Sequence, residues 1–205
     1  MVALDELRRL STMSDGLLLL CTADDPRFLM RRRLDVGRLL HDVAARWQTA
    51  SRREVDVEAA GSLTVRADED RLRHALDALV ENALRATEPD GAVALAAHRD
   101  RAGVAIEVRD GGPGVPREAQ ERIFDRFYRV DVESVRRGSG LGLAIVKAIA
   151  TAHGGSVALD SEPGRTVFTL RLPAAPPVPP APDWSTVAAP AARAAAEQPG
   201  RGRRG

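Results

Sequence analysis

VRDGGPGVP (108–116), ERIFDRFYRVD (121–131) and RRGSGLGLA (136–144) are the three parts of the stretch that decides the fold. The first part closes an apolar run with an acidic residue and a glycine turn, and the third opens an apolar helix with alternating glycines. Glycine lets a ligand approach the backbone closely, and a glycine-rich turn at a helix N-terminus presents free N–H groups to an anion. Two such turns around a basic, aromatic loop therefore predict a nucleotide site with a lid.

A helix is predicted upstream of this stretch, over residues 71–87, because its leucine and valine residues recur at helical spacing. Asn82 lies in the second half of this helix, and the basic Arg85 follows it. The other predicted elements are helices at 34–50, 116–122 and 141–153, with strands at 54–58, 63–66, 92–98, 104–109, 157–159 and 166–172.

Taken together, these segments resemble the ATP-binding catalytic domain of bacterial sensor histidine kinases, a branch of the GHKL (Bergerat-fold) ATPases. Four motifs of that family occur in the family's order: the N box at 81–85, the G1 box at 110–114, the F box at 123–129 and the G2 box at 138–143. The resemblance implies an α/β two-layer sandwich, in which a mixed sheet of about five strands carries helices on one face. It places ATP between the helical layer and the lid, and one bundle-type helix before the domain.

The resemblance implies that Asp110 recognises the adenine base of the nucleotide. A carboxylate at the start of a glycine turn can accept a hydrogen bond from an exocyclic amine, which is the family role of this Asp toward adenine N6. Guanine has a carbonyl acceptor at that position and is disfavoured. Asn82 offers an amide oxygen, which suits Mg²⁺ held together with waters and substrate phosphates. The implied cofactors are therefore ATP and Mg²⁺, with Asn82 as the metal ligand.

The other implied site residues lie in the lid and the glycine turns. Arg85 and Arg129 stand where the family has cations near the phosphates, and they are the predicted catalytic residues. Phe124 and Phe127 are expected to anchor the lid to the core, whereas Arg126 is either a phosphate contact or a solvated side chain. The predicted nucleotide-binding set is Asn82, Asp110, Gly112, Gly114, Tyr128, Gly138, Gly140, Leu141 and Gly142.

Two departures from the family pattern bear on the reaction. Ala78 stands four residues before Asn82, where many of these kinases carry a second Asn and the hydrolytic relatives carry a water-activating Glu. We therefore expect weaker or water-mediated metal binding and no efficient ATP hydrolysis. His153 is expected at a helix C-terminus, which suits a partial positive charge. No histidine of the chain is followed by the residues that mark the family's phospho-accepting helix; the four are His41, His74, His98 and His153.

Composition limits the class of protein. The chain has 205 residues with 30 basic and 29 acidic side chains, so its overall charge does not indicate nucleic acid as a partner. The single cysteine, Cys21, excludes an internal disulfide framework and a cysteine-rich zinc site. The longest apolar run, at 17–21, is far shorter than the roughly 20 residues of a spanning helix, and the N-terminus lacks a signal-peptide pattern. A cytoplasmic location is therefore predicted.

Four segments are predicted along the chain. They are part of a dimerisation and phosphotransfer helix at 1–23, a polar linker at 24–33, the ATP-binding domain at 34–172 and a disordered tail at 173–205, rich in Pro, Ala and Arg. In the predicted helix at 3–23, Leu10, Met13, Leu17 and Leu20 form a bundle seam. This seam favours a homodimer or a hetero-assembly through the helix; the alternative is a helix packed on its own domain.

The function that the resemblance implies is transfer of the ATP γ-phosphoryl group to a histidine for two-component signal transduction. That histidine is expected on another chain or on a segment that this sequence lacks. The implied partners are a histidine-bearing dimerisation helix or domain and, indirectly, a response regulator. The alternative is a non-catalytic ATP-binding module that regulates a kinase or another partner. A serine kinase of the anti-sigma type fits less well, because of the helix before the domain and the kinase-like lid.

Overall fold

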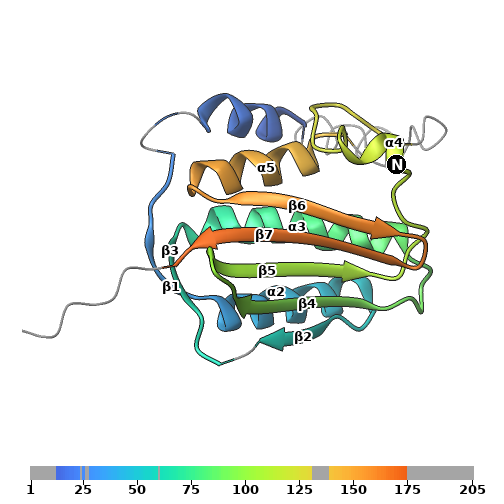
Figure 1. Ribbon diagram of the computed structural model, residues 1–205, viewed down its shortest axis with the longest axis horizontal. Helices are drawn as coiled ribbons and strands as arrows, with labels where there is room; N and C mark the ends of the chain where they lie inside the picture. Colours follow the sequence, from blue (N-terminus) through green and yellow to red (C-terminus); the bar gives the residue numbers. More distant parts are fainter. Residues whose placement is uncertain (1–12, 24, 26–27, 60, 131–138, 175–205) are drawn as a thin grey trace, which may run out of the picture. The chain divides into compact units, whose positions relative to one another are not determined.

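A five-stranded mixed sheet forms the centre of the fold in this computed structural model, which describes residues 13–23, 25, 28–59, 61–130 and 139–174. The strands lie in the order β2-β4-β5-β7-β6, with β2 parallel to β4 and the other neighbouring pairs antiparallel (Figure 1). Their bounds are β2 (Asp56–Ala59), β4 (Val93–Arg99), β5 (Gly103–Asp110), β6 (Ser156–Glu162) and β7 (Arg165–Pro173). The predicted sandwich with a mixed sheet of five strands is confirmed.

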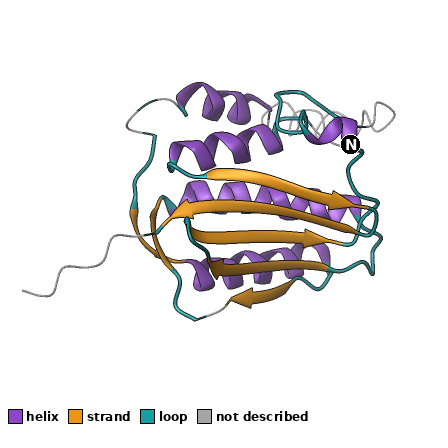
Figure 2. Cartoon of the chain, viewed as in Figure 1, coloured by secondary structure: helices purple, strands orange, loops and turns teal. Residues whose placement is uncertain are grey.

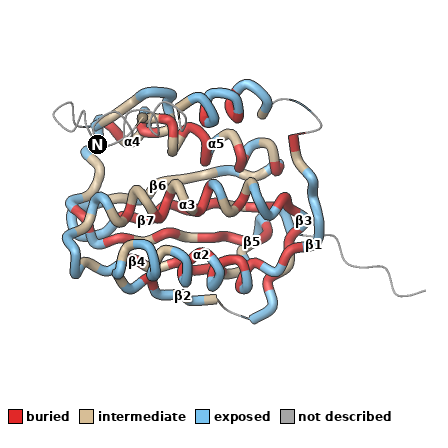
Figure 3. The backbone as a smooth tube through the Cα atoms, turned by 180° about the vertical axis from the view of Figure 1, so that it is seen from behind, coloured by how far each residue is buried: buried red, intermediate tan, exposed pale blue. Residues whose placement is uncertain are grey.

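Helices cover one face of this sheet. α2 (Val36–Ser51) and α3 (Glu69–Ala86) lie behind the sheet in Figure 1 and in front of it when the molecule is seen from behind in Figure 3. α5 (Gly142–Ala152) packs against α3, and the short α4 (Arg117–Gln120) precedes the lid segment. Figure 2 shows the same layers by type of secondary structure. The predicted placement of helices on one face is therefore confirmed.

The alternation of side chains along β5 positions the acidic residue at its end. Val104, Ile106 and Val108 are fully buried on the side of the sheet that faces the helices. Two residues later, Asp110 ends the strand on the same side and is 6% exposed. The helical layer, rather than the open face of the sheet, therefore receives the Asp110 carboxylate.

Aspartates begin the two long helices. Asp35 and Asp68 have extended backbones, and each carboxylate accepts a hydrogen bond from an N–H group in the first turn of its helix. The donors are Arg38 N–H and Arg71 N–H, each at 3.1 Å. These side-chain caps satisfy backbone donors that a helix leaves free at its N-terminus, so they fix where both helices start.

A strand occupies the junction between the predicted linker and the first predicted helix of the domain. β1 (Arg32–Asp35) pairs antiparallel with β3 (Thr64–Ala67) in a separate two-stranded sheet. Leu34 lies opposite Val65 in this pairing, and both are buried, so the pair of apolar side chains supports the strand. The helix predicted from residue 34 therefore begins at Val36.

The N-terminal helix packs on α5 of its own chain over its described part, 13–22. A Cβ placed on Gly16 would lie 3.1 Å from a side-chain carbon of α5, and Leu19 and Leu20 are buried. Of the predicted seam, Leu20 is buried on the domain, whereas Leu17 is 38% exposed. Leu10 lies outside the described residues. Assembly through this helix stays a prediction.

The C-terminal strand runs slightly past the predicted end of the domain. β7 extends to Pro173, and Ala174 forms an isolated bridge with Val65. The rest of the predicted tail, from residue 175, lies outside the described residues. Among the residues that the structure describes, no helix is both long enough and apolar enough to cross a membrane.

Candidate nucleotide-binding site

Asp110 carries a buried oxygen atom without a partner. Its Oδ1 accepts a hydrogen bond from the Gly112 N–H at 2.9 Å, which shapes the G1 turn. Its Oδ2 is buried and has no hydrogen-bond partner among the described residues. Burial raises the pKa of the Asp110 carboxyl, and the Gly112 hydrogen bond opposes that rise only in part. A free acceptor at this depth is suited to an N–H donor of a ligand.

The glycines of the G1 turn permit close contact between backbone segments. A Cβ placed on Gly112 would lie 2.9 Å from the Ala86 carbonyl oxygen at the end of α3. Gly114 has φ of +83°, and a Cβ there would lie 2.8 Å from the Glu162 carbonyl group. The Gly164 N–H also donates to the Gly112 carbonyl oxygen at 2.9 Å. The turn is therefore held between the C-terminal end of α3 and the β6–β7 hairpin.

The G2 turn contacts the same helix two turns earlier. A Cβ placed on Gly142, the first residue of α5, would lie 3.8 Å from the Ala78 Cβ. Leu141 precedes α5 and is buried, which fixes the start of this helix against the core. The free N–H groups of the first turn of α5 are the expected partners of an anionic ligand. Gly138, also predicted for this site, lies outside the described residues.

One face of α3 joins the two glycine turns. Ala78, Asn82 and Ala86 are spaced four residues apart, so their side chains lie in one row along the helix. Ala78 contacts the G2 turn and Ala86 contacts the G1 turn, so Asn82 lies between them. Eight residues of helix span about 12 Å, a length suited to a nucleotide that runs from its base to its phosphates. Asn82, which is half-buried, therefore occupies the middle of this row.

Arg85 and Glu81 are joined by an ion pair on the exposed surface of α3.

Among the described residues, no group of three or more His, Cys, Asp or Glu side chains could hold a metal ion. The donor set at this position is the single amide oxygen of Asn82, which fits Mg²⁺ that arrives with the phosphates of a nucleotide and keeps its waters. This arrangement does not fit a metal ion held by protein ligands alone.

The two lid phenylalanines behave differently. Phe124 is half-buried and meets the Phe168 ring edge-on, with ring centroids 6.3 Å apart, so it anchors the lid segment to the core as predicted. Phe127 is 52% exposed, so the prediction that it anchors the lid through its ring is wrong. Instead its backbone makes the connection: Phe127 has φ of +64°, and its N–H donates to the Gly140 carbonyl oxygen at 2.9 Å.

Gly140 is required where the lid meets the G2 turn. Its φ is +70°, and a Cβ there would lie 2.9 Å from Phe127 backbone atoms. Tyr128 is half-buried, and the Arg122 guanidinium carbon lies 4.6 Å from the centre of its ring. Arg129 is half-buried and Arg126 is exposed. The structure thus joins the start of the lid to the G2 turn, whereas residues 131–138 of the lid lie outside the described residues.

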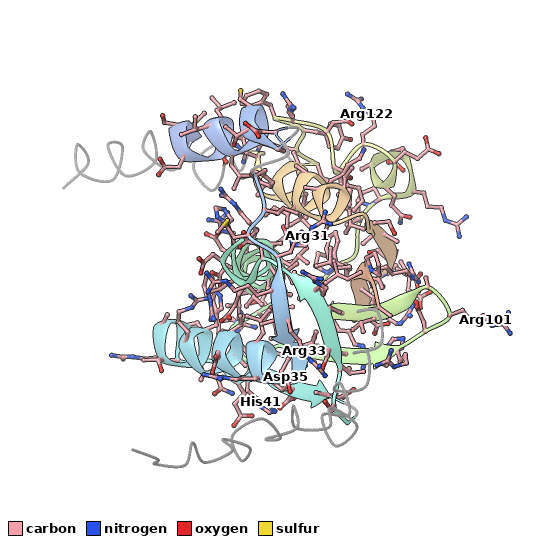
Figure 4. The ribbon with its side chains drawn as sticks, turned by 90° about the vertical axis from the view of Figure 1, so that its left-hand side faces the viewer. Arg31, Arg33, Asp35, His41, Arg101 and Arg122 are labelled. Carbon is pink, nitrogen blue, oxygen red and sulfur yellow. The ribbon has the colours of Figure 1, made fainter. Side chains whose placement is uncertain are left out.

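His153 is a buried, neutral histidine. Its Nδ1 lies 2.8 Å from the Ile149 carbonyl oxygen and its Nε2 accepts the Asp68 N–H at 3.0 Å, so Nδ1 carries the proton. Burial lowers the pKa of His153. His153 does lie at the C-terminus of α5, as expected, but its ring is neutral rather than partly positive. The cation at this end of α5 is Arg31, which donates to the Ala152 carbonyl oxygen (Figure 4).

Sequence reasoning missed Arg53, whose guanidinium contacts the end of α3. It donates to the Leu84 and Gly91 carbonyl oxygens and to the Thr87 hydroxyl oxygen. No motif marks this arginine, because its partners lie 31 to 38 residues further along the chain.

Two cavities in the described part of the chain border the predicted motifs. One, of about 830 Å³, is formed between helix 13–22, residues 28–31, residues 124–126 of the F box and α5. The other, of about 660 Å³, lies over β4, β5, β6 and β7, and its lining includes Asp110 and Gly111 of the G1 turn as well as Arg109 and Arg171. The predicted site is defined by the two contacts along α3, at Ala78 and Ala86, and by the free oxygen of Asp110.

This fold and this constellation define an ATPase domain of one particular class. Residues 67–176 match the family model described as histidine kinase-, DNA gyrase B- and HSP90-like ATPase, which covers more than half of the chain. The chain belongs to this family, and its relatives include sensor histidine kinases. It is 40% identical over 173 residues to the probable sensor histidine kinase HK of Mycobacterium tuberculosis (strain CDC 1551 / Oshkosh). The match covers 83% of this chain and 45% of that relative, so the chain spans less than half of that protein.

Two further similarities bear on function. The chain is 41% identical over 136 residues to the sensor histidine kinase component HK1 of Mycobacterium tuberculosis (strain ATCC 25618 / H37Rv), and the match covers 66% of this chain and 79% of HK1. Among solved structures, full-length ShkA in complex with AMPPNP is similar, with a TM-score of 0.67 and 31% identity over 81% of this chain and 36% of ShkA.

Proposed function

We propose that this chain binds ATP with Mg²⁺ and donates the γ-phosphoryl group to a histidine, as the catalytic domain of a sensor histidine kinase. The observation that carries the proposal is the row along α3, which sets Asn82 between the two glycine turns. The unpartnered Oδ2 of Asp110 lies at the G1 end of this row, and the N-terminus of α5 lies at the other.

The residues have separate roles in this proposal. Asp110 Oδ2 accepts a hydrogen bond from the exocyclic amine of adenine, and the N–H groups at the start of α5 hold the phosphates. Asn82 presents its amide oxygen to Mg²⁺, which supplies charge neutralisation on the phosphates when bound. Arg85 and Arg129 offset the charge of the transferred group. Tyr128 closes the site beside the lid.

The phospho-accepting histidine is proposed to belong to a separate chain or segment, since none of the four histidines carries the family's acceptor pattern. HK1, a relative of which the match covers 79%, is itself named as a component of a sensor histidine kinase. A domain of this kind requires a histidine-bearing dimerisation helix or domain as its direct partner, and a response regulator then receives the phosphoryl group. The proposal places the reaction in the cytoplasm, which supplies the ATP.

Incubation with γ-labelled ATP and Mg²⁺ tests the proposal. The chain is incubated alone and with the histidine-bearing dimerisation domains of several related kinases, each beside an Asp110→Ala variant. Acid-labile label on the added domain, lost with Asp110→Ala, supports phosphoryl donation. ATP binding without transfer to any of several such domains supports the non-catalytic module instead. If the chain binds no ATP, both functions are excluded.

A further inference from the structure

Arg53 makes four hydrogen bonds with the end of α3 and the loop that follows it. One guanidinium nitrogen, Nη1, donates to the Leu84 carbonyl oxygen at 2.8 Å and to the Thr87 carbonyl oxygen at 3.4 Å. The other, Nη2, donates to the Thr87 hydroxyl oxygen at 2.7 Å and to the Gly91 carbonyl oxygen at 2.8 Å. A single half-buried side chain therefore binds the last turn of α3 and both ends of the loop that follows it.

The backbone around Arg53 directs this side chain. α2 ends at Arg52, which has φ of +58° and donates its N–H to the Gln48 carbonyl oxygen. The Arg53 N–H then donates to the Ser51 hydroxyl oxygen at 3.2 Å. The Gln48 side-chain amide donates to the Val55 carbonyl oxygen at 3.0 Å, which holds the chain as it enters β2. The position from which the guanidinium extends is therefore fixed on both sides.

The segment that Arg53 binds is the one that forms the nucleotide site. The last turns of α3 contain Asn82 and Arg85, and Ala86 is in contact with Gly112 of the G1 turn. The carbonyl groups at the end of a helix lack partners within the helix and carry partial negative charge, so a cation there is stabilising. We infer that Arg53 is a positioning residue for nucleotide binding, which holds the end of α3 against the G1 turn. This inference rests on the proposed function.

Arginine is suited to this role in a way that lysine is not. The guanidinium is planar and presents donors in a fixed fork, so one group can satisfy four acceptors on two segments. Lysine would bring the same charge as a single compact ammonium group. The contacts therefore require the shape of the arginine side chain as well as its charge. The variants Arg53→Lys and Arg53→Ala can separate these two contributions.

The experiment compares ATP affinity in four proteins by calorimetric titration: wild type, Arg53→Ala, Arg53→Lys and the control Arg52→Ala, which removes an adjacent exposed arginine. We expect Arg53→Ala to weaken ATP binding about tenfold and Arg53→Lys about threefold, with Arg52→Ala unchanged. Methylguanidinium in the buffer is expected to restore affinity to Arg53→Ala but not to Arg53→Lys. Hydrogen exchange is expected to rise in Arg53→Ala at residues 84–92 only.

Each outcome decides the inference. Unchanged ATP affinity in Arg53→Ala overturns it, as does a uniform rise in hydrogen exchange without rescue by methylguanidinium, which would indicate a purely structural residue. If Arg53→Ala does not fold, Thr87→Val removes one acceptor of Arg53 together with the hydrogen bond from the Thr87 hydroxyl to the Ala83 carbonyl oxygen. An unchanged ATP affinity in that variant overturns the inference. If wild-type protein binds no ATP, the proposed function fails first and the inference fails with it.

Discussion

Replacement of Asp110 by asparagine is expected to stabilise the free protein and weaken its binding of ATP. The side chain keeps its shape, so Oδ1 can still accept the Gly112 N–H. The change removes the negative charge from a carboxylate that is buried and has one oxygen without a partner. Fold stability and ligand affinity should therefore respond in opposite directions.

The structure sets the size of both effects. A buried polar group without a partner costs about 1–3 kcal/mol, and more when it is charged. We expect Asp110→Asn to recover about 1–2 kcal/mol, which corresponds to roughly 2–8 °C in Tm for a chain of this size. In the complex, a hydrogen bond from the adenine amine to a charged acceptor contributes about 1.5–3 kcal/mol. Its loss should weaken ATP binding by about 10- to 150-fold.

The gain in stability should depend on pH. Because burial raises the pKa of Asp110 in the folded state, the protonated carboxyl is the form that the fold favours. The contribution of this group to stability is therefore present below the ordinary carboxyl pKa of about 4 and is lost as pH rises through the folded value. The gain in stability of Asp110→Asn over the wild-type protein should therefore be largest at neutral pH and small at low pH.

Thermal unfolding of the free protein and titration with ATP check both effects. Asp160→Asn is the control, because Asp160 is exposed and its ion pair with Arg165 lies on the surface, where such pairs contribute about 0–1 kcal/mol. A lower Tm for Asp110→Asn, or an ATP affinity equal to that of wild type, would refute the reasoning about the free oxygen.

Three further predictions concern other parts of the site. Gly114→Ala should destabilise the fold by about 2–4 kcal/mol in urea unfolding, because the new Cβ adds a clash with the Glu162 backbone to the cost of a positive φ. Gly164 has nearly the same φ but open space around it, so Gly164→Ala should lower the free energy of unfolding by only about 1–2 kcal/mol. Equal losses of stability in the two variants would contradict the role of the clash. Since burial lowers the pKa of His153, the unfolded chain binds the proton more readily, and stability should fall as pH drops below the ordinary value of 6.5, by up to about 1.4 kcal/mol per unit. Urea unfolding at several pH values should give a shallower slope for His153→Gln, and an unchanged slope would exclude this role. Asn82→Ala should weaken ATP binding about tenfold with Mg²⁺ and little in EDTA, as measured by calorimetry; equal losses in both buffers would argue against metal coordination.

The sequence predicts the parts of the fold whose signals are local. Helical spacing identifies α3, and the glycine turns identify the ends of β5 and the start of α5, because each signal lies within a few neighbouring residues. Asp110 could be singled out for the same reason. The contacts of Ala78 and Ala86 could not, since an alanine in a helix carries no signal of what packs against it.

Contacts between distant segments account for what the sequence did not predict. β1 exists because Leu34 meets Val65, 31 residues away, and a stretch of arginines alone resembles a linker. His153 is neutral because the Asp68 N–H, 85 residues earlier, reaches its ring. Phe127 follows an aromatic pattern that predicts burial, yet its positive φ turns the backbone toward Gly140 and leaves the ring exposed. Tertiary packing overrides local preference at each of these positions.

Because Ala78 and Ala86 contact different glycine turns, α3 also sets the distance between these two turns. The separation between the two glycine turns is set by the pitch of a rigid helix, not by the lengths of the loops that carry them. One residue inserted between Ala78 and Ala86 would rotate the later contact by about 100° and shift it by about 1.5 Å along the axis. Insertions in the lid leave this distance unchanged. The spacing of motifs should therefore be strict within α3 and permissive between the G1 and G2 turns.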